Sequence, residues 1–292
     1  MESNTSKRIM YGSRPPKSFV EEFEFTQDSP YFIRVKQLEA EDFAPPHYSK
    51  YTIEILLCDS VSGKISIDQK VFQLHSEERA AFVIPPDIIH STSFSPGGTV
   101  QVMQISIPYM NGMINFPAML EKVNIKVSEL VNSFPEYDRL YPYFQQLIEN
   151  DGNCFTCCRT LISIMEELCC SLREKEHVHG ALAEHSNAEL KKLIAWSGEN
   201  YSMQISIDMA AKLVGMSRSY FCSWFKSKTN MTYVQYLNQV RISNAARLLI
   251  SGESTSATAY ECGFTNASYF IQVFKKTHGC TPKEYVLRYS HS

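Results

Sequence analysis

The sequence has no apolar run that approaches the roughly 18 residues that a membrane-spanning helix needs. Its first residues, MESNTSKRIMYGSRPPK, also lack the apolar core of a secretory signal peptide. We therefore expect neither membrane insertion nor secretion, and we expect the protein to be cytoplasmic. With 44% hydrophobic and 20% charged residues the composition is typical of a globular protein, and the length of 292 residues predicts two domains.

An excess of one charge sign is also missing, because the formal net charge is only −3. The two ends of the chain nevertheless differ. Residues 186–292 carry 12 Lys and Arg against 6 Asp and Glu, a net +6, and residues 1–185 carry 16 against 25, a net −9. A basic segment joined to an acidic one fits phosphate binding at the basic end, although many solvated helical surfaces reach +6.

The nine cysteines include no two matched C-x-x-C pairs and no C-x-x-C with histidines nearby. Without an export signal we expect free thiols. Five cysteines lie in CFTCC (154–158) and CC (169–170), and their spacing fits the apolar side of one helix. A zinc site in this segment is the weaker alternative.

The helix predicted over this cysteine-rich segment carries two apolar stripes. One follows a heptad repeat and is the predicted dimerisation seam, formed by Phe155, Cys158, Ile162, Met165, Cys169 and Leu172. The adjoining stripe consists of Cys157, Leu161, Ile164 and Leu168. Two stripes need two covering surfaces, so we expect the body of the same chain on one side and the identical helix of a second copy on the other. This predicts a homodimer.

One pattern occurs twice near the C-terminal end, in SIDMAAKLVGMSRSYFCSWFKSKTNMTYVQYL (206–237) and STSATAYECGFTNASYFIQVFKKTHGCTPKEYV (254–286). Phenylalanines and tyrosines recur at matched positions, and the second copy has one extra residue in its turn. In the first copy, Ser206 and Ser217 can cap two short helices, which Gly215 joins through a left-handed backbone. Each copy therefore has the order of a helix-turn-helix.

The second helix of each copy has an apolar face and a polar face. The predicted inward residues are Tyr220, Phe221, Trp224 and Phe225 in the first copy and Tyr269, Phe270, Val273 and Phe274 in the second. Between the copies, TYVQYLNQVRISNAARLLISG has helical periodicity and ends at Gly252. Some 18 residues of this helix would span ~27 Å, which can hold two reading helices about one DNA turn, ~34 Å, apart.

The stretch GFTNASYFIQVFKKTHGCTPKEY resembles the signature of the AraC/XylS family of bacterial transcription regulators, through its Gly-Phe turn, Tyr-Phe pair, Phe-Lys-Lys and closing Gly-x-Thr-Pro-x-x-Tyr. The resemblance covers roughly residues 187–288. It implies two helix-turn-helix units tied by a long helix, each placing its second helix in the major groove of double-stranded DNA.

The resemblance implies DNA contacts from the outward face of each reading helix. The predicted DNA-binding residues are Arg218, Ser219, Cys222, Ser223, Lys226, Asn266, Ala267, Ser268, Gln272 and Lys275. Family members often carry an arginine two residues after the Tyr-Phe pair, where this sequence has Ser223 and Gln272. Gln272 can pair with adenine, so we expect more base specificity from the second unit. We expect the basic side chains to contact phosphates.

Residues 19–115 show a succession of strand patterns. These are YFIRVKQL (31–38), TIEILLC (52–58), KISID (64–68), KVFQL (70–74), AAFVIP (80–85), IIHSTSF (88–94) and TVQVMQISI (99–107). Turn signals between them, such as Ser62-Gly63 and Gly97-Gly98, predict a sandwich or barrel. We expect no long helix before about residue 117.

The stretches PPHYSKYTIEILLC and FVIPPDIIHS resemble the small cupin-type barrel at the N-terminus of many regulators of the same family. In cupin enzymes they supply three histidines and a glutamate to a divalent metal. Here His47, Glu54 and His90 stand at three of those positions, and Ser49 replaces the fourth. Because these regulators generally hold an organic effector, the resemblance implies an effector site without a resident metal. A three-ligand metal site and ordinary histidines at the barrel rim are the alternatives.

Strand alternation bears on where Glu54 points. If Ile53, Ile55 and Leu57 pack outward under a helix, Glu54 points into the barrel, where it needs a hydroxyl-rich ligand, a metal or a basic partner such as Arg34. A one-residue change of register would reverse this direction. The predicted effector-binding residues are His47, Tyr51, Glu54, His90 and Arg34.

These patterns predict an N-terminal all-β cupin-like barrel with following helices and a C-terminal all-α domain with two helix-turn-helix units joined by a long helix. The expected boundaries are 1–18 for a flexible arm, 19–115 for the effector-binding domain, 116–175 for a helical dimerisation region, 176–186 for a linker and 187–292 for the DNA-binding domain.

We expect a sequence-specific, homodimeric transcription regulator controlled by a small-molecule effector, for which a carbohydrate is one candidate. The expected partners are double-stranded DNA, the effector and a second copy, with RNA polymerase as a further candidate; no cofactor and no membrane are expected. One alternative is a cupin-type metal-dependent enzyme with a helical appendage, for which Ser49 leaves the metal shell incomplete. Another is an effector-independent regulator whose barrel only dimerises.

Overall fold

The computed structural model describes residues 9–11, 30–68, 70–111, 116–122, 125, 130, 135–150, 154–174 and 188–289. The linker predicted over 176–186 lies outside these residues, as does most of the arm predicted over 1–18. Within that arm, Ile9–Tyr11 form strand β1, which pairs in parallel with β2 (Tyr31–Gln37). This short piece of the predicted flexible arm is therefore part of a sheet.

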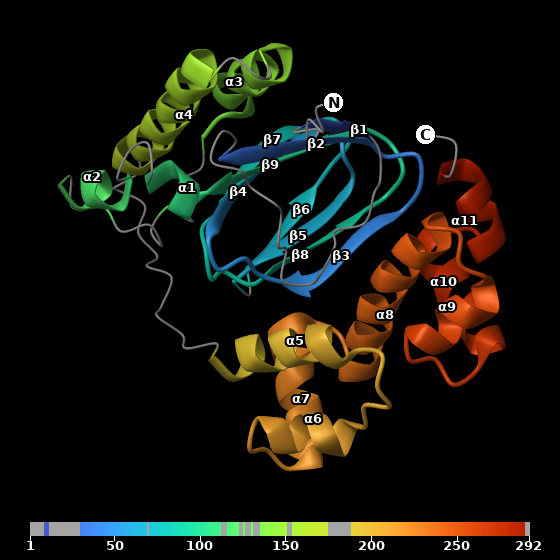
Figure 1. Ribbon diagram of the computed structural model, residues 1–292. Coiled ribbons are helices and arrows are strands. Elements are labelled where there is room, and N and C mark those ends of the chain that lie inside the picture. The colour runs from blue at the N-terminus through green and yellow to red at the C-terminus, as the bar shows by residue number, and fades with distance from the viewer. Residues whose placement is uncertain are drawn as a thin grey trace, which may run out of the picture.

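The strands of the described chain form two sheets that face each other (Figure 1). One sheet has the order β1-β2-β9-β4-β7 and the other has the order β3-β8-β5-β6. The further strands are β3 (Asp42–His47), β4 (Thr52–Asp59), β5 (Gly63–Ile67), β6 (Lys70–Leu74), β7 (Arg79–Ile84), β8 (His90–Phe94) and β9 (Thr99–Ser106). Apart from β1 and β3, these strands follow the predicted strand patterns closely.

Strand β3 has no counterpart among the predicted strands. Its sequence contains Pro45 and Pro46, which lack the N–H group that a strand donates to its neighbour. The prolines are tolerated because β3 is an edge strand that pairs only with β8, and because the register shifts between Ala44 and His47. After this shift His47 pairs directly with His90.

Strand β4 alternates between two cores, as its sequence predicts. Ile53 and Ile55 lie in a core that helices α3 (Tyr137–Glu149) and α4 (Cys154–Glu174) share with the five-stranded sheet. These helices lie over the outer side of that sheet (Figure 1), while α1 (Ile107–Asn111) and α2 (Phe116–Lys122) follow β9. Leu56 faces the core between the two sheets. Glu54 shares the face of Leu56 and therefore points between the sheets.

Helix α4 packs one of its two apolar stripes, Cys157, Leu161, Ile164 and Leu168, into this core. On the heptad stripe Phe155 is 90% exposed and Ile162 is 40% exposed, and Cys158, Cys169 and Leu172 are partly buried. Met165 is only 4% exposed and lies in the core of its own chain, contrary to its predicted place at the centre of an intermolecular seam. A straight helix drifts about 20° per heptad from a 3.5-residue repeat, so one heptad stripe does not keep to one face.

The C-terminal part of the described chain is helical. Its helices are α5 (Ala188–Asn200), α6 (Ile207–Leu213), α7 (Arg218–Thr229), α8 (Tyr233–Ile250), α9 (Thr255–Glu261), α10 (Ala267–His278) and α11 (Pro282–Tyr289). The side chains of Ser206 and Ser217 cap α6 and α7, as predicted, and Gly215 has a φ of 69° in the turn between them. The pairs α6–α7 and α9–α10 coincide with the two copies of the repeated pattern, and α8 joins them.

The sheets and the C-terminal helices are in direct contact. Tyr48, which follows β3, is 4% exposed and lies in a core formed by residues of α5 to α8. Ile89, which precedes β8, packs against the same core. Lys191 of α5 pairs with Asp87 (Nζ to Oδ1, 3.4 Å) and also lies over the Tyr48 ring, 5.7 Å from its centre. Residues next to His47 and His90 thus touch the helical part.

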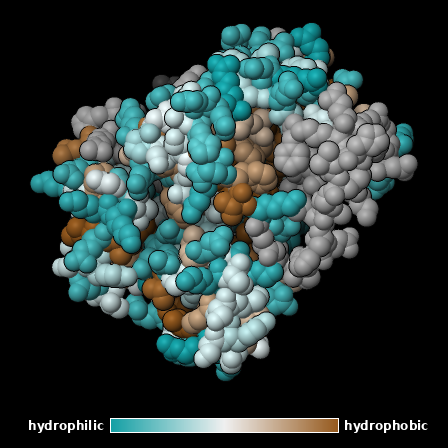
Figure 2. Space-filling view, turned by 180° about the vertical axis from the view of Figure 1, so that it is seen from behind, coloured by the Kyte–Doolittle hydropathy of each residue, from teal (hydrophilic) through white to brown (hydrophobic). Residues whose placement is uncertain are grey.

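Hydrophilic residues predominate on the face of the molecule that Figure 2 shows, with hydrophobic residues in small patches between them. Among the described helices, none combines the length and the hydropathy that crossing a bilayer requires.

Candidate nucleic-acid interface and buried histidine cluster

Helices α7 and α10 present the predicted DNA-binding residues on an open surface. Arg218, Ser219, Cys222, Ser223, Lys226, Asn266, Ser268, Gln272 and Lys275 are exposed, and Ala267 is partly buried. Each of the two helices therefore exposes polar and cationic side chains on one face. The exposed Ile271 and Tyr269 border this face on α10.

The opposite faces of α7 and α10 are anchored by corresponding phenylalanines. Phe221 and Phe225 pack edge to face against Tyr233 of α8, with ring centres 5.3 and 5.4 Å apart. In the second pair, Phe274 packs in the same way against Tyr285 of α11 at 5.3 Å. Such aromatic contacts fix the rotation of each helix and so decide which side chains face outward.

Tyr220 and Tyr269 differ from the sequence prediction, which placed both side chains inward. They are 60% and 45% exposed, respectively. The hydroxyl of Tyr269 accepts a hydrogen bond from Asn238 Nδ2 at 2.8 Å, on the surface of α8. The predicted apolar face was too wide: the phenylalanines are buried and Trp224 and Val273 pack against the same cores, whereas the two tyrosines stay outside them. Both tyrosines are neighbours in sequence of the predicted DNA-binding residues, and helical periodicity alone contains no signal for their exposure.

Two predicted DNA-binding residues already have partners in the protein. Asn266 caps α10, and its Oδ1 accepts hydrogen bonds from the backbone N–H groups of Ser268 and Tyr269. Arg218 pairs with Asp208 (Nη1 to Oδ2, 2.6 Å), and both side chains are exposed. An exposed ion pair contributes little stability, so Arg218 can exchange the carboxylate for a phosphate at small cost.

Between the two sheets, three of the predicted effector-binding residues form a buried cluster. His47, Glu54 and His90 are 8%, 7% and 3% exposed, and one ligand atom of each lies within 4.8 Å of the others. His90 Nε2 is 3.5 Å from Glu54 Oε1, and the two imidazole centres are 4.1 Å apart. The two histidines are therefore neither solvated nor at an open rim.

The backbone fixes the orientation of both imidazoles. His47 Nδ1 lies 2.7 Å from the carbonyl oxygen of Pro45, and His90 Nδ1 lies 3.1 Å from that of Ile88. A carbonyl oxygen only accepts, so each Nδ1 carries the hydrogen and each Nε2 is the second ring nitrogen that remains for other contacts. Glu54 is held in turn by Gln104, whose Nε2 donates to Oε2 at 2.8 Å.

Burial and neighbouring groups shift the pKa values in this cluster. Burial lowers the pKa of His47 to about 4, with a further lowering by His90 that outweighs the opposite effect of Glu54. For Glu54, burial raises the pKa, but the charge and hydrogen bond of His90, together with His47 and Gln104, bring it below its usual value. At neutral pH the site therefore contains a carboxylate and a neutral His47.

The other predicted effector-binding residues lie apart from this cluster or at its edge. Tyr51 is 64% exposed. Arg34 is buried on β2, with its guanidinium 5.7 Å from the centre of the Phe32 ring, and Glu54 interacts with His90 and Gln104 instead of the expected Arg34. Sequence reasoning missed Gln104, although a buried glutamine within the apolar strand TVQVMQISI is a detectable signal.

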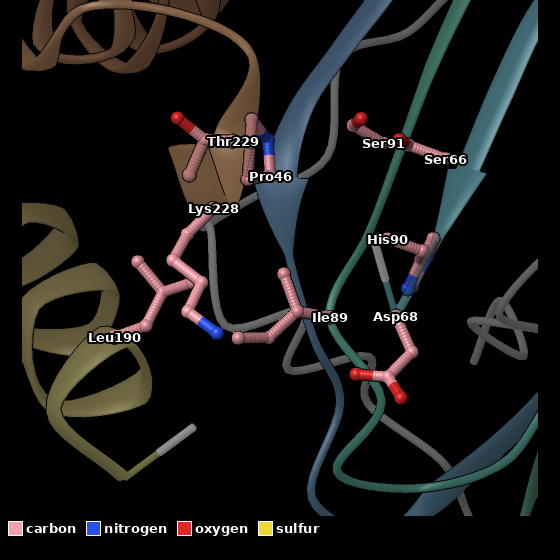
Figure 3. Close-up of a pocket in the computed structure, with 9 residues that line it drawn as sticks. All are labelled: Pro46, Ser66, Asp68, Ile89, His90, Ser91, Leu190, Lys228 and Thr229. Atoms are coloured by element: carbon pink, nitrogen blue, oxygen red, sulfur yellow. The ribbon is translucent and has the colours of Figure 1, made fainter. Parts of the chain in front are cut away.

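A small pocket of about 20 Å³ lies beside this cluster, at the contact between the sheets and the helices. Figure 3 shows that residues of both parts line it, with His90 and Asp68 from the sheet side and Leu190, Lys228 and Thr229 from α5 and α7. The volume suits one or two water molecules.

Residues 210–288 match the family described as a helix-turn-helix domain. An uncharacterized HTH-type transcriptional regulator of Pseudoalteromonas carrageenovora is 39% identical to this chain over 105 residues, which are 36% of this chain and 63% of that protein. The HTH-type transcriptional activator RhaR of Mannheimia succiniciproducens is 47% identical over 66 residues, which are 22% of this chain and 24% of RhaR. The chain thus spans less than two thirds of either relative.

A likeness in fold extends further along the chain. The crystal structure of an apo ToxT variant from Vibrio cholerae has a TM-score of 0.50 and 16% sequence identity, and the match covers 91% of this chain and 99% of ToxT. An N-terminal part built of two sheets, followed by helices, is therefore an arrangement shared with ToxT.

Proposed function

We propose that the whole chain is a sequence-specific DNA-binding transcription regulator of the AraC type, from the match of residues 210–288 to a helix-turn-helix domain family and the similarity to HTH-type regulators. The single observation that supports this best is the pair of matched helix pairs α6–α7 and α9–α10, each with an exposed polar face on its second helix. The relatives are named transcriptional regulators, which favours a regulator over the metal-dependent enzyme.

In this proposal α7 and α10 each enter a major groove. Helix α8, which separates the two units, has 18 residues and a length of about 27 Å. This length is close to the ~34 Å between successive major grooves on one side of DNA. The capping box of Thr232 and Gln235 at the start of α8 fixes where this spacer begins.

We also propose control by a small-molecule effector that binds between the sheets of the N-terminal, cupin-like part. The support is the buried polar cluster of His47, Glu54 and His90, which is costly to maintain in an apolar core without a binding role. A homodimer through the exposed side of α4 is supported by the 90% exposure of Phe155. RNA polymerase stays a candidate partner without support from a particular contact.

Selection from a randomised duplex library tests the DNA-binding proposal. The full chain should enrich a motif with two conserved segments about 10 base pairs apart, since two reading helices contact successive major grooves. A chain with Lys226→Glu and Lys275→Glu should enrich nothing, because both exposed cations lie on the reading helices. Lys64→Glu, on the exposed side of β5, is the matched control. Failure of the unmodified chain to enrich any motif would disprove the proposal.

A further inference from the structure

The buried cluster between the sheets has the composition of a metal site. Imidazole nitrogens and a carboxylate oxygen are a donor set that zinc and neighbouring first-row metals accept, whereas calcium and magnesium require oxygen ligands. The three donors come from three different strands, β3, β4 and β8, so the fold itself brings them together.

We propose that His47, Glu54 and His90 bind one divalent transition-metal ion, and that this ion is the effector of the regulator. This inference rests on the proposed function for its regulatory part only. The ion is of the zinc or cobalt(II) class, held by two imidazole nitrogens and one carboxylate oxygen, with its remaining positions open to water.

The three ligand atoms lie within 4.8 Å of one another, so a small inward movement of the side chains brings all of them into bonding distance of one ion. In a tetrahedral site with metal–ligand bonds of about 2.1 Å, two ligand atoms are about 3.4 Å apart. The distance between His90 Nε2 and Glu54 Oε1, 3.5 Å, is close to this value. The backbone carbonyls of Pro45 and Ile88 hold the Nδ1 side of both rings, which leaves Nε2 as the ligand atom. Gln104 holds the second carboxylate oxygen of Glu54. These are the outer contacts that orient ligands in metal sites.

Ser49, which stands where a fourth protein ligand was expected, serves a different purpose. Its Oγ accepts hydrogen bonds from the N–H and the hydroxyl of Thr52, at 3.2 and 2.6 Å, and so closes the turn into β4. The set therefore consists of three protein ligands. Three ligands with an open position suffice to hold zinc elsewhere.

The position of the cluster connects the ion to the helical part. His47 is followed by Tyr48, and His90 is preceded by Ile89; both neighbours pack into the core that α5 to α8 form. A metal that draws His47 and His90 toward Glu54 pulls on β3 and β8 at the two places where they contact that core. A change of this kind biases the position of α7, whose residues Lys228 and Thr229 line the adjacent pocket.

Cobalt(II) titration of the chelator-treated full chain tests the site itself. One equivalent should bind, with a visible spectrum of nitrogen and oxygen ligation. Glu54→Gln and His90→Ala should weaken binding more than about 100-fold, and Gln104→Leu, which removes an outer contact, about 10-fold to 100-fold. His75→Ala, an exposed histidine on the same half, is the control and should bind like the unmodified chain. Thermal unfolding without metal shows whether each variant is folded.

Two results would overturn the site: unchanged cobalt affinity in folded Glu54→Gln, or a thiolate charge-transfer band that assigns the metal to exposed Cys170 or Cys222.

The proposal that the ion is the effector is tested with the DNA motif that library selection yields. Zinc should change the affinity of the unmodified chain for that motif at least about 5-fold and leave Glu54→Gln unaffected, in line with ordinary allosteric coupling. Equal DNA affinity with and without bound zinc rejects the ion as effector. Absence of DNA binding under every condition rejects the proposed function, whereas the cobalt result stands independently.

Discussion

At the level of single residues, Gln272 and Lys226 are both exposed but have different expected roles on DNA. The amide of Gln272 can contact adenine N6 and N7, so Gln272→Ala should cost about 1–3 kcal/mol at one base pair and relax the preference there. Lys226→Ala should weaken binding to all sequences alike and reduce the salt slope by about one unit. Binding across a site library at two salt concentrations measures both effects. A uniform loss for Gln272→Ala, with specificity intact, would contradict the assignment.

His278, at the end of α10, should make the helical part sensitive to acid. Its ring lies between Phe274 and Tyr285 with a buried Nε2, and burial lowers its pKa from 6.5 to about 4, against a raising effect of Asp42 on β3. Because the folded pKa lies below the unfolded value, the neutral ring stabilises the fold fully above pH 6.5. This contribution, at most about 3 kcal/mol, is lost as the pH falls toward 4.

The test of His278 uses tryptophan fluorescence. Trp196 and Trp224 are the two tryptophans of the sequence, and both lie in the helical part, so their fluorescence reports its unfolding. His278→Phe should flatten the dependence of the unfolding free energy on pH between 4 and 6.5 by about 1.4 kcal/mol per pH unit. His75→Phe, at an exposed histidine, should not. Equal slopes in the two variants would rule out His278 as the titrating group.

The sequence predicted the direction of single side chains where a local period governs it. Alternation in β4 was enough to place Glu54 on the face opposite Ile53 and Ile55, because neighbouring residues of a strand face opposite ways. That the Glu54 face lies between the sheets depended on helices covering the isoleucines, as α3 and α4 do. Its partners could not be predicted, since His90 and Gln104 belong to other strands and only the sheet order brings them to Glu54. The expected partner Arg34 lies on β2, with β9 between its strand and β4.

At the level of elements, α4 should hold two copies of the chain together through its exposed side. Phe155 and Ile162 lie on that side and are 90% and 40% exposed, so Phe155→Glu with Ile162→Glu should convert a dimer into a folded monomer. Light scattering measures the mass. Glu77→Lys, an exposed change in the turn between β6 and β7, should leave the dimer intact. An unchanged dimer in the double variant would exclude α4 as the interface. Met165→Glu cannot serve as a test, because it places a charge in the core of the chain itself.

Helices with a cap signal and an aromatic pattern were predictable as elements, because both signals are local. Ser206, Ser217 and Gly215 occur in the structure in the roles that their sequence positions indicate. Strand β3 was not predictable, since Pro45 and Pro46 argue against a strand unless it is known to lie at an edge. The exposed side of α4 was only partly predictable, because a heptad pattern does not say which stripe its own chain covers.

At the scale of the whole molecule, Tyr48 should couple the sheets to the DNA-binding helices. It is the buried side chain of the sheet half within the core of α5 to α8, and the pairing of Lys191 with Asp87 lies beside it. Tyr48→Ala should remove this contact and cost about 3 kcal/mol, in the range for deleting a buried aromatic side chain. Since the contact joins two halves that have cores of their own, its loss should separate their unfolding.

Calorimetry, which detects both halves, and tryptophan fluorescence, which detects the helical half, distinguish these outcomes. In the unmodified chain the two methods should give one common midpoint, and in Tyr48→Ala the fluorescence midpoint should depart from the main calorimetric transition. Tyr51→Ala is the matched control, because Tyr51 lies three residues further on and is 64% exposed. If Tyr48→Ala unfolds with the same single midpoint as Tyr51→Ala, the contact carries no coupling. A metal-driven movement of β3 would then not reach α7 through Tyr48.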